Sequence, residues 1–347
     1  MMKILSAAQL KVICEGILKA VGTPEDEAEI VSDTLVKANL RGVDSHGVIR
    51  LPVYLSRVKH KTIIPGAPFK TVRESASSAL VDGGSGFGQV IAVKAMKLAI
   101  KKAERTGLGA VSAFNTNHFG MAAYYALLAL QSDMISVIIS NAGPYVVPWG
   151  GRVPMLGTNP ICVGIPSGQS FPIILDMATS ATARSRIEKI AKEGGSIPEG
   201  WAIDESGKPT TDPIAALRGA LLPFGGVKGY GLSLIIDLIS GALAGAACGK
   251  HVVSLYPEDR KCNVGQFFLA INVDAFTPIE EFKERVDKAI REIKSCPTAP
   301  GHSEILIPGE IEHRTEQKRL REGIPIGDNV WKVIERMCEE ANIRMEV

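Results

Sequence analysis

The sequence predicts an α/β protein with helical ends, and three observations carry this prediction. From about residue 70 to residue 276, short β-type runs alternate with amphipathic helices rich in Ala and Lys. The first forty residues have helical periodicity, and the chain finishes in a charged amphipathic helix. Because 46% of the 347 residues are hydrophobic, the chain can bury one large core or two moderate ones, and two domains are expected.

Two helices are expected in the first forty residues. Ser6 can cap the first helix and Gly22 can stop it. The apolar face of this helix is formed by Leu10, Ile13, Ile17 and Leu18. Thr23-Pro24 opens the second helix, and the acidic run 25–27 is favourable in its first turn.

Strands and helices then alternate along the chain. The segment 71–84 is expected to be extended chain that runs into a glycine turn, and an amphipathic helix over 90–107 follows. Further strands are expected over 109–118, 134–143, 159–168, 170–178 and 265–276. Further helices are expected over 122–133, 229–247, 280–295 and 328–342.

Composition and charge disfavour several classes of protein. Lys and Arg number 39 against 37 for Asp and Glu, so the net charge of +2 provides no electrostatic reason to bind nucleic acid. Charged residues interrupt the apolar start of the chain, so no secretory signal is expected and the cytoplasm is the predicted location. The six cysteines are widely separated, which predicts reduced thiols and no metal site.

The apolar segment 229–247 could be mistaken for a membrane span. It carries Asp237 near its middle and four glycines. A charge at that depth would be costly in lipid, whereas a helix rich in small residues packs tightly inside a soluble core. A buried helix is therefore the preferred interpretation, and no membrane contact is expected.

Two glycine-rich loops could bind phosphate. The first has the spacing Gly84-x-Gly86-x-Gly88, with Gln89 where a dinucleotide-binding fingerprint needs its third glycine, and no acidic residue ends a second strand about twenty residues later. The second, 222–233, surrounds Lys228 with glycines just before a helix, a setting that suits a cofactor phosphate. A tight turn with an incidental surface lysine explains the second loop equally well.

His118 is a candidate acid/base residue. It closes a strand-like run and follows the polar residues 115–117. Strand ends that face a crevice are where α/β folds place catalysis, and an imidazole has a pKa suited to taking a proton from an alcohol near neutral pH. A capping or merely hydrogen-bonded histidine is the competing interpretation.

Asp44, Ser45 and His46 place an acid, a hydroxyl and an imidazole side by side. Because consecutive side chains diverge in a helix or a strand, these three residues are not expected to form a nucleophile triad. The spacing instead allows His46 and Arg50 to share a helical face, with Ser45 as the helix cap. An arginine fork beside an imidazole suits a small carboxylate, although a capped helix with a surface arginine would look the same.

Eight stretches, in order along nearly the whole chain, together resemble one family. They are RGVDSHGVIRLP (41–52), VDGGSGFGQ (81–89), NTNHFGMAAYYA (115–126), GTNPICVGIP (157–166), LDMATS (175–180), IPEGWAIDESGKPTTDP (197–213), LPFGGVKGYGLSL (222–234) and IPGEIE (307–312). The family is that of the type-2 malate/L-lactate dehydrogenases, NAD(P)-dependent oxidoreductases that include malate, sulfolactate, ureidoglycolate and diketogulonate enzymes.

The resemblance implies a cofactor domain distinct from the Rossmann fold. That domain would be built on a mixed, largely antiparallel sheet, and both chain ends would form a helical domain. We expect the helical, substrate-binding and dimerisation domain over 1–115 and 296–347, and the NAD(P)-binding domain over 116–295. The resemblance also implies homodimers whose active site lies at the interface between subunits.

The resemblance assigns roles to individual residues. His118 matches the family's acid/base, which takes the hydroxyl proton as hydride leaves for the nicotinamide. Ser45, His46 and Arg50 match the substrate-binding segment, where Arg50 would hold the substrate carboxylate; in some members this histidine is instead proposed as the proton donor. The matching cofactor contacts are Ser140, Asp176, Met177, Ala178, Lys228, Gly309, Glu310 and Ile311.

Two departures from the family pattern leave NAD and NADP both open as cofactors. Val227 replaces a histidine that many members have before the lysine, and Ser185-Arg186 replaces the usual Gly-Lys pair. The stretches 262–276 and 304–326 look most similar to the archaeal malate/L-sulfolactate branch, whose substrate bears a carboxylate and a second anionic group. A second cationic side chain is then expected in the pocket, and Arg184 and Arg186 are the candidates.

The predicted activity is the interconversion of an L-2-hydroxy acid, malate or sulfolactate, and its 2-oxo acid by hydride transfer. One alternative is the reduction of a cyclic imino acid, or of another 2-oxo acid of the ureidoglycolate or diketogulonate type. The non-enzyme alternative is a catalytically silent nucleotide-binding or scaffold protein on the same fold.

Overall fold

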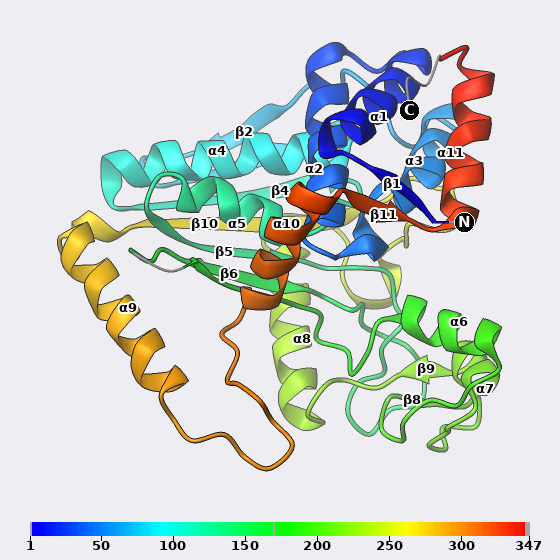
Figure 1. Ribbon diagram of the computed structural model, residues 1–347. Coiled ribbons are helices and arrows are strands. Elements are labelled where there is room, and N and C mark those ends of the chain that lie inside the picture. Colours follow the sequence, from blue (N-terminus) through cyan, green and yellow to red (C-terminus); the bar gives the residue numbers. More distant parts are fainter. Residues whose placement is uncertain (1, 169–170, 344–347) are drawn as a thin grey trace.

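A seven-stranded sheet forms the centre of the molecule (Figure 1). The computed structural model describes residues 2–168 and 171–343. Among the strands of the described residues, β3 and β4 pair in parallel and all other neighbours in the sheet are antiparallel, so the predicted mixed, largely antiparallel sheet is confirmed. In spatial order the strands are β2 (Lys70–Glu74), β3 (Ser78–Asp82), β4 (Leu108–Thr116), β10 (Val264–Asn272), β5 (Met134–Ser140), β6 (Ile161–Ile165) and β7 (Ile173–Met177).

Helices cover both faces of this sheet. On one face lie α4 (Gly88–Thr106) and α5 (Ala123–Leu130), and on the other lies α8 (Val227–Ser240) (Figure 1). Apolar residues fill the core between the sheet and the helices α4 and α5, among them Val81, Met96, Val111, Tyr125 and Phe268. The remaining helix beside the sheet is α9 (Ile279–Lys294), which begins and ends within one residue of the predicted bounds.

Both chain ends build a helical body beside the sheet, as expected. The first strand, β1 (Lys3–Leu5), pairs with β11 (Ile324–Ile326), so segments from the N-terminal and C-terminal parts of the chain lie side by side (Figure 1). Ser6 caps the first helix through a reciprocal capping box with Gln9, which confirms the predicted start. The predicted apolar face of that helix is fully buried. The helices of this body are α1 (Ala7–Ala20), α2 (Glu25–Leu40), α3 (Leu51–Lys59), α10 (Glu310–Glu322) and α11 (Asp328–Glu340).

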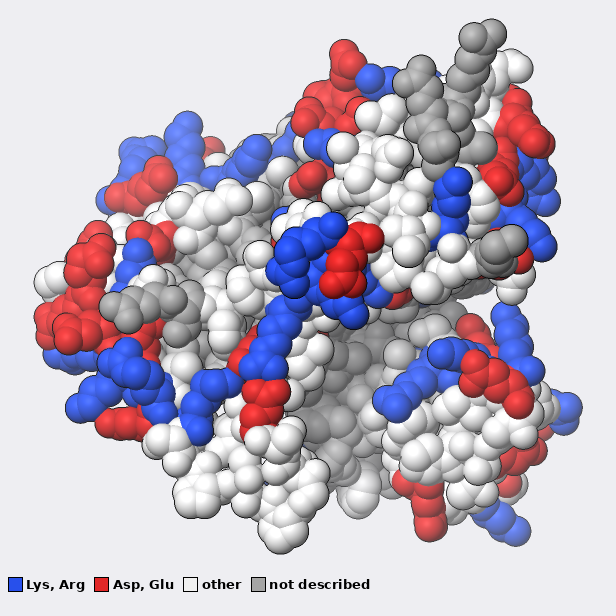
Figure 2. All heavy atoms as spheres, in the orientation of Figure 1, with Lys and Arg blue, Asp and Glu red and all other residues white. Residues whose placement is uncertain are grey.

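A small lobe forms from residues 184–221, a range in which the sequence analysis expected neither helices nor strands. It contains α6 (Arg184–Glu193), α7 (Pro213–Arg218), β8 (Ala202–Ile203) and β9 (Ala220–Leu221). Ile187, Ile197 and Leu221 belong to its own apolar cluster. Figure 2 shows a hollow between this lobe and the rest of the molecule, and the cavity described below lies there. Short 3-10 turns, η3 (Gly249–His251) and η4 (Val273–Ala275), complete the connections outside the site.

The helix predicted over 229–247 is shorter than expected. It ends at Ser240, and turns over 241–245 follow it; an added Cβ at Gly241 would lie 2.4 Å from the Cys248 sulfur. Asp237 is buried, and its Oδ2 accepts a hydrogen bond from the Gly249 N–H at 2.8 Å. Within the described ranges, no helix is long and apolar enough to cross a membrane.

Two predicted boundaries differ from the elements of the structure. The strand predicted from residue 170 begins at Ile173, and Ser170 itself lies outside the described residues. The central sheet takes strands from both predicted domain ranges, and β4 spans the proposed boundary between residues 115 and 116. The division into two domains at that position stays a prediction.

Candidate active site

A cavity of about 1100 Å³ opens at one end of the central sheet. Five strands meet there, because β4, β5 and β7 end where β6 and β10 begin. The opposite wall comes from the helical body, through residues 41–50 and 306–312. The volume slightly exceeds the range of about 300–1,000 Å³ that is usual for small-molecule sites. It leaves room for a dinucleotide and a small acid together.

The DSHGVIR segment does not form the expected Ser45-capped helix. It folds as two 3-10 turns, η1 (Asp44–His46) and η2 (Val48–Arg50), which Gly47 separates before α3 begins. Gly47 packs against Asn39, where an added Cβ would lie 2.1 Å from the amide oxygen. That same oxygen accepts a hydrogen bond from the Val48 N–H at 2.9 Å. A contact with α2 therefore bends the segment, and no pattern in the local sequence predicts this contact.

The triad interpretation fails as predicted, although for a different reason. Asp44 turns away from the cavity, and Arg319 of α10 binds its carboxylate through two hydrogen bonds of 2.7 and 3.1 Å. Ser45 and His46 do not diverge as expected, because the 3-10 turn places Ser45 Oγ 3.0 Å from His46 Nδ1. Asp44 thus fastens the segment to the C-terminal part of the chain, and the Ser45–His46 pair faces the cavity.

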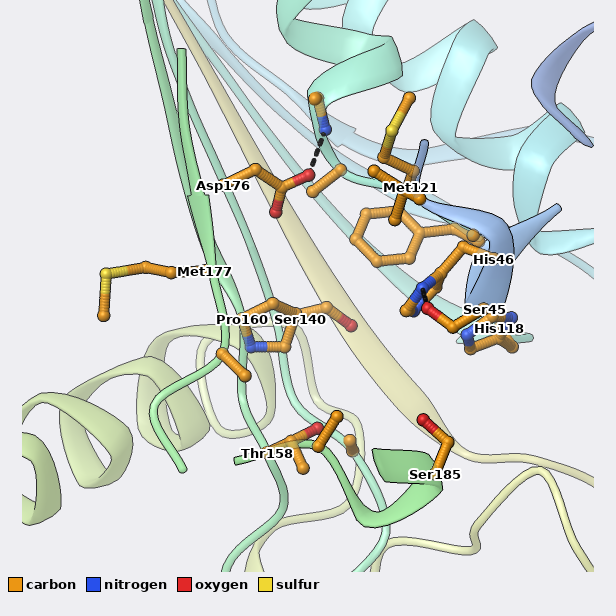
Figure 3. Close-up of a pocket in the computed structure, with 18 of the residues that line it drawn as sticks. Ser45, His46, His118, Met121, Ser140, Thr158, Pro160, Asp176, Met177 and Ser185 are labelled. Atoms are coloured by element: carbon orange, nitrogen blue, oxygen red, sulfur yellow. Dashed lines mark hydrogen bonds between the residues drawn. The ribbon is translucent and has the colours of Figure 1, made fainter. Parts of the chain in front are cut away.

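His118 lies beside His46 although 72 positions separate them in the sequence. The two imidazole rings stack with centroids 5.6 Å apart and planes 21° apart (Figure 3). His118 Nδ1 lies 2.7 Å from the Tyr54 hydroxyl, which leaves Nε2 for a ligand in the cavity. Sequence reasoning missed Tyr54; the only signal was its spacing of four residues from Arg50.

The glycine loop that failed as a dinucleotide fingerprint holds the His118 segment in place. Gly88 is the first residue of α4, and an added Cβ would lie 2.2 Å from the Asn117 carbonyl oxygen and 2.4 Å from that of His118. The Asn117 side chain donates hydrogen bonds to the carbonyls of Ser85 and Gly86, at 3.1 and 2.8 Å. The loop therefore has a structural role at the site rather than a phosphate-binding one.

Both histidines are held in the neutral form. Burial lowers the pKa of His46 from 6.5 to about 4, and the nearby Arg50 guanidinium acts in the same direction. Burial also lowers the pKa of His118 well below its usual value, with contributions from His46, Arg50 and Arg57. A neutral imidazole has a lone pair that can accept a proton, so both rings are in the form that a general base needs at neutral pH.

Arg50 presents its guanidinium to the same end of the cavity. Its Nε donates to the Ser45 carbonyl at 2.7 Å, which fixes the side chain. Its Nη1 lies 3.5 Å from the Tyr256 hydroxyl, at the outer limit of a hydrogen bond. No carboxylate pairs with it in the described part of the chain, so the terminal N–H groups can bind an acidic ligand.

The strand ends carry most of the predicted cofactor residues. Ser140, Asp176 and Met177 line the cavity (Figure 3), and so does Ala178. Ser140 Oγ lies 3.0 and 3.1 Å from the carbonyl oxygens of Asn141 and Gly265, so its hydroxyl hydrogen is directed at the backbone and its lone pairs can accept from a ligand amide. Asp176 Oδ2 accepts from the Ala123 N–H at 2.8 Å, and burial raises the pKa of this carboxyl from 3.8 to about 6.

The start of α10 brings two of the three residues predicted there to the cavity. Gly309 and Ile311 line the cavity, whereas Glu310 does not. The Glu310 carboxylate is buried and accepts two hydrogen bonds of 2.7 Å from Lys294, another from Arg314, and one of 3.1 Å from the Ile307 N–H. Glu310 therefore shapes the start of this helix. Lys228, in the first turn of α8, also lies outside the lining residues.

The comparisons with known proteins agree with this geometry. Residues 5–335 match the family model described as malate/L-lactate dehydrogenase. An L-sulfolactate dehydrogenase of Methanocaldococcus jannaschii is 44% identical, over 99% of this chain and 98% of that protein. The solved malate dehydrogenase of Entamoeba histolytica is 36% identical with a TM-score of 0.96, and the match covers 100% of both chains.

The chain belongs to the malate/L-lactate dehydrogenase family. It is a 2-hydroxy acid dehydrogenase, which removes the catalytically silent scaffold as an alternative. A more distant solved relative is the Δ1-piperideine-2-carboxylate reductase of Pseudomonas syringae. That protein is 28% identical with a TM-score of 0.87, over 96% of this chain and 99% of the relative.

For a member of this family the cations of the cavity matter, because its substrates are acids. Of the two candidates, Arg184 lines the cavity, whereas Arg186 packs its guanidinium 4.8 Å from the centre of the Trp201 ring and does not line it. Sequence reasoning missed Arg41, which lines the cavity from the end of α2. Arg41 Nη1 donates to Glu316 at 3.0 Å, and its buried Nε has no hydrogen-bond partner within residues 2–168 and 171–343.

Proposed function

We propose that this dehydrogenase uses NAD or NADP to interconvert an L-2-hydroxy acid, malate or sulfolactate, and its 2-oxo acid. One observation carries the proposal: two neutral imidazoles and the Arg50 guanidinium converge at one end of a cavity large enough for a dinucleotide. The similarity to an L-sulfolactate dehydrogenase and a malate dehydrogenase supports these two substrates above other hydroxy acids.

The chain's own residues bind the acid and move its proton. Arg50 holds the substrate carboxylate through its terminal N–H groups. His118 Nε2 takes the hydroxyl proton during oxidation and returns it during reduction. In the tautomer that accepts a proton at Nε2, Nδ1–H donates to the Tyr54 oxygen, so Tyr54 orients the ring. His46, held by Ser45, either orients the substrate or supplies the proton.

The residues present fit a nicotinamide cofactor. When bound, this cofactor accepts or delivers the hydride at the substrate's C2 carbon. The residues that would hold it lie at the strand ends and at the start of α10: Ser140, Asp176, Met177, Ala178, Gly309 and Ile311. The unpartnered Arg41 Nε provides a buried donor that an anionic or polar cofactor group would satisfy. For Lys228 and Glu310 a direct cofactor contact rests on the family resemblance alone.

A second candidate is the reduction of a cyclic imino acid. The same imidazole could protonate a nitrogen, and a reductase named for such a substrate shares the fold over nearly all of both chains. Oxidation of NADH and of NADPH should be measured with oxaloacetate, sulfopyruvate, pyruvate and a cyclic imine. Turnover of the imine in preference to the 2-oxo acids would replace the proposal with this alternative.

The substitution His118→Ala tests the assignment of the base. We expect turnover to be largely abolished, because general acid–base catalysis contributes roughly 10²–10⁴-fold to a rate. Cofactor binding, measured by fluorescence titration with NADH and NADPH, should persist because the predicted cofactor residues lie elsewhere along the cavity. Near-normal turnover in this variant would contradict the assignment, and His46→Ala then becomes the test for the other imidazole.

We also propose a homodimer that works in the cytoplasm, with the active site at the interface between subunits. The support is the family resemblance, together with exposed apolar residues on one stripe of α8. Val227, Ile235 and Leu238 are 56%, 53% and 45% exposed, respectively. Single exposed apolar residues are ordinary, but a stripe along a helix is typical of a contact surface.

A further inference from the structure

A segment of the chain that the proposed chemistry does not use forms one wall of the substrate end. Residues 253–262, which we name the pocket strap, contribute Val253, Ser254, Leu255, Tyr256 and Cys262 to the cavity lining. The Tyr256 side chain is 49% exposed and brings its hydroxyl to 3.5 Å from Arg50 Nη1. At that distance neither group satisfies the other well, so both remain available to the same ligand oxygen.

The strap is held by Arg57, a guanidinium with no exposed surface. Arg57 donates to the carbonyl oxygens of Leu255, Pro257 and Arg260, at 3.0, 3.3 and 2.8 Å. A fourth, longer contact of 3.4 Å reaches the Asn117 side chain, next to His118. Every one of these acceptors is neutral. Burying a guanidinium without a carboxylate partner costs folding free energy. A role in positioning the strap therefore explains Arg57 better than a contribution to stability does.

One short helical segment organises all of these groups. Arg50, Tyr54 and Arg57 follow each other at spacings of four and three residues, which places them on one face across η2 and α3. Each reaches a different part of the site: Arg50 the expected carboxylate position, Tyr54 the His118 ring, and Arg57 the strap. The position of Tyr256 relative to Arg50 is therefore set by Arg57.

We propose that Tyr256 is a further substrate-contact residue, whose hydroxyl donates to the same anionic group as Arg50, and that Arg57 is the residue that positions it. The inference rests on the proposed function, because it takes the ligand at Arg50 to be the carboxylate or sulfonate of a hydroxy acid. An arginine fork and a phenol together supply three donors, which suits a group with several acceptor oxygens.

The substitution Tyr256→Phe removes the hydroxyl and keeps the ring. We expect KM for the 2-oxo acid to rise about tenfold, as for the loss of one hydrogen bond to a charged group, with kcat little changed. Tyr230→Phe is the matched control, because Tyr230 lies in α8 and outside the cavity lining. An unchanged KM in Tyr256→Phe overturns the role of Tyr256.

The substitution Arg57→Lys keeps the charge but cannot reach the same set of acceptors. We expect KM to rise as in Tyr256→Phe and kcat to fall as well, because Asn117 loses a support beside His118. In the double variant the KM effects should not multiply, because Arg57 acts on the substrate through Tyr256. Multiplicative KM effects, or a kcat loss with KM unchanged, would show a merely structural role.

Binding of succinate keeps this test separate from the proposed function. Succinate has the two carboxylates of malate but no hydroxyl to oxidise. Calorimetry in the presence of NADH therefore measures its affinity for the anion site without turnover. Weaker succinate binding by Tyr256→Phe than by the wild type supports the inference even if Arg57→Lys fails to fold. If the wild type turns over no 2-oxo acid, the proposed function fails; equal or absent succinate binding by both proteins overturns the inference.

Discussion

At the scale of single residues, the site depends on histidines that burial and neighbouring cations keep neutral. Ser45, His46, Arg50 and His118 were all singled out from the sequence, and the structure brings them to one end of one cavity. Tyr54, Arg57 and Arg41 could not be found in the same way. Their significance comes from burial and from partners distant in the sequence, such as the strap for Arg57, and residue type shows neither. Only Tyr54 has a signal in the sequence, its spacing of four residues from Arg50.

The depressed pKa of His46 predicts a pH dependence of stability. The unfolded chain takes up a proton near pH 6.5, whereas the folded chain does so only near pH 4. Between these pH values the unfolded state binds more protons than the folded state. The contribution of neutral His46 to the free energy of unfolding is therefore fully present above pH 6.5 and is lost as the pH falls toward 4. The free energies of unfolding of the wild type and of His46→Gln, measured with urea, should therefore converge or cross as the pH is lowered through this range.

The comparison with a variant is needed because another group acts in the opposite direction. The raised pKa of Asp176 makes the folded state retain a proton between pH 3.8 and about 6, so its contribution to stability decreases as the pH rises through that range. The difference between wild type and His46→Gln removes this shared contribution. Parallel stability curves for the two proteins would show that His46 is not held neutral.

At the scale of elements, sequence patterns predicted correctly those helices and strands whose form depends on interactions within the same segment. The first helix was predicted from a capping residue and a periodic apolar face, and both are present in the structure. The DSHGVIR segment was predicted wrongly because the contact between Gly47 and Asn39 decides its shape. The strands β1, β8, β9 and β11 escaped prediction because two or three residues are too few to show an alternating pattern.

The substitution Gly88→Ala tests whether α4 seats the His118 segment. Its Cβ would press on the backbone oxygens of Asn117 and His118, which cannot move aside as a flexible side chain could. We expect the free energy of unfolding to fall by roughly 1–3 kcal/mol, as for other overpacked sites, and kcat to fall as His118 is displaced. Thermal or urea unfolding and steady-state kinetics measure the two effects.

Gly231→Ala provides the matched control in another helix. Beyond its chain neighbours and its own helix backbone, no atom of the chain lies within 4 Å of the Cβ position at Gly231, and alanine is the better helix former. Because Gly231 lies on the α8 stripe proposed as a subunit contact, the comparison is made at a protein concentration where the chain is monomeric, and there the free energy of unfolding should be unchanged or slightly higher. If both substitutions behave alike, the close approach of Gly88 to the His118 backbone has no energetic consequence. In that case the glycine loop would serve only as a turn between β3 and α4.

At the scale of the whole molecule, the site lies where two parts of the chain meet. The central sheet supplies His118, Ser140 and Asp176, while the segments from both chain ends supply residues 41–50 and 306–312. The pairing of β1 with β11 and the hydrogen bonds from Arg319 to Asp44 join the N-terminal part of the chain to its C-terminal part. The sequence predicted the helical ends and the largely antiparallel sheet, but not the lobe of α6 and α7 that forms the other side of the hollow.

The predicted homodimer can be tested through the dependence of activity on protein concentration. Ser45, His46, Arg50 and His118 already lie together within one chain, so an isolated subunit holds the expected chemical groups. If the active site also needs the neighbouring subunit, dissociation should lower the specific activity at saturating substrate and cofactor. Sedimentation should then show a species of twice the chain mass, and specific activity should fall over the dilution range in which that species disappears. The same dilutions made with inert carrier protein control for adsorption, and constant activity in a solution of monomers would refute an active site at the interface.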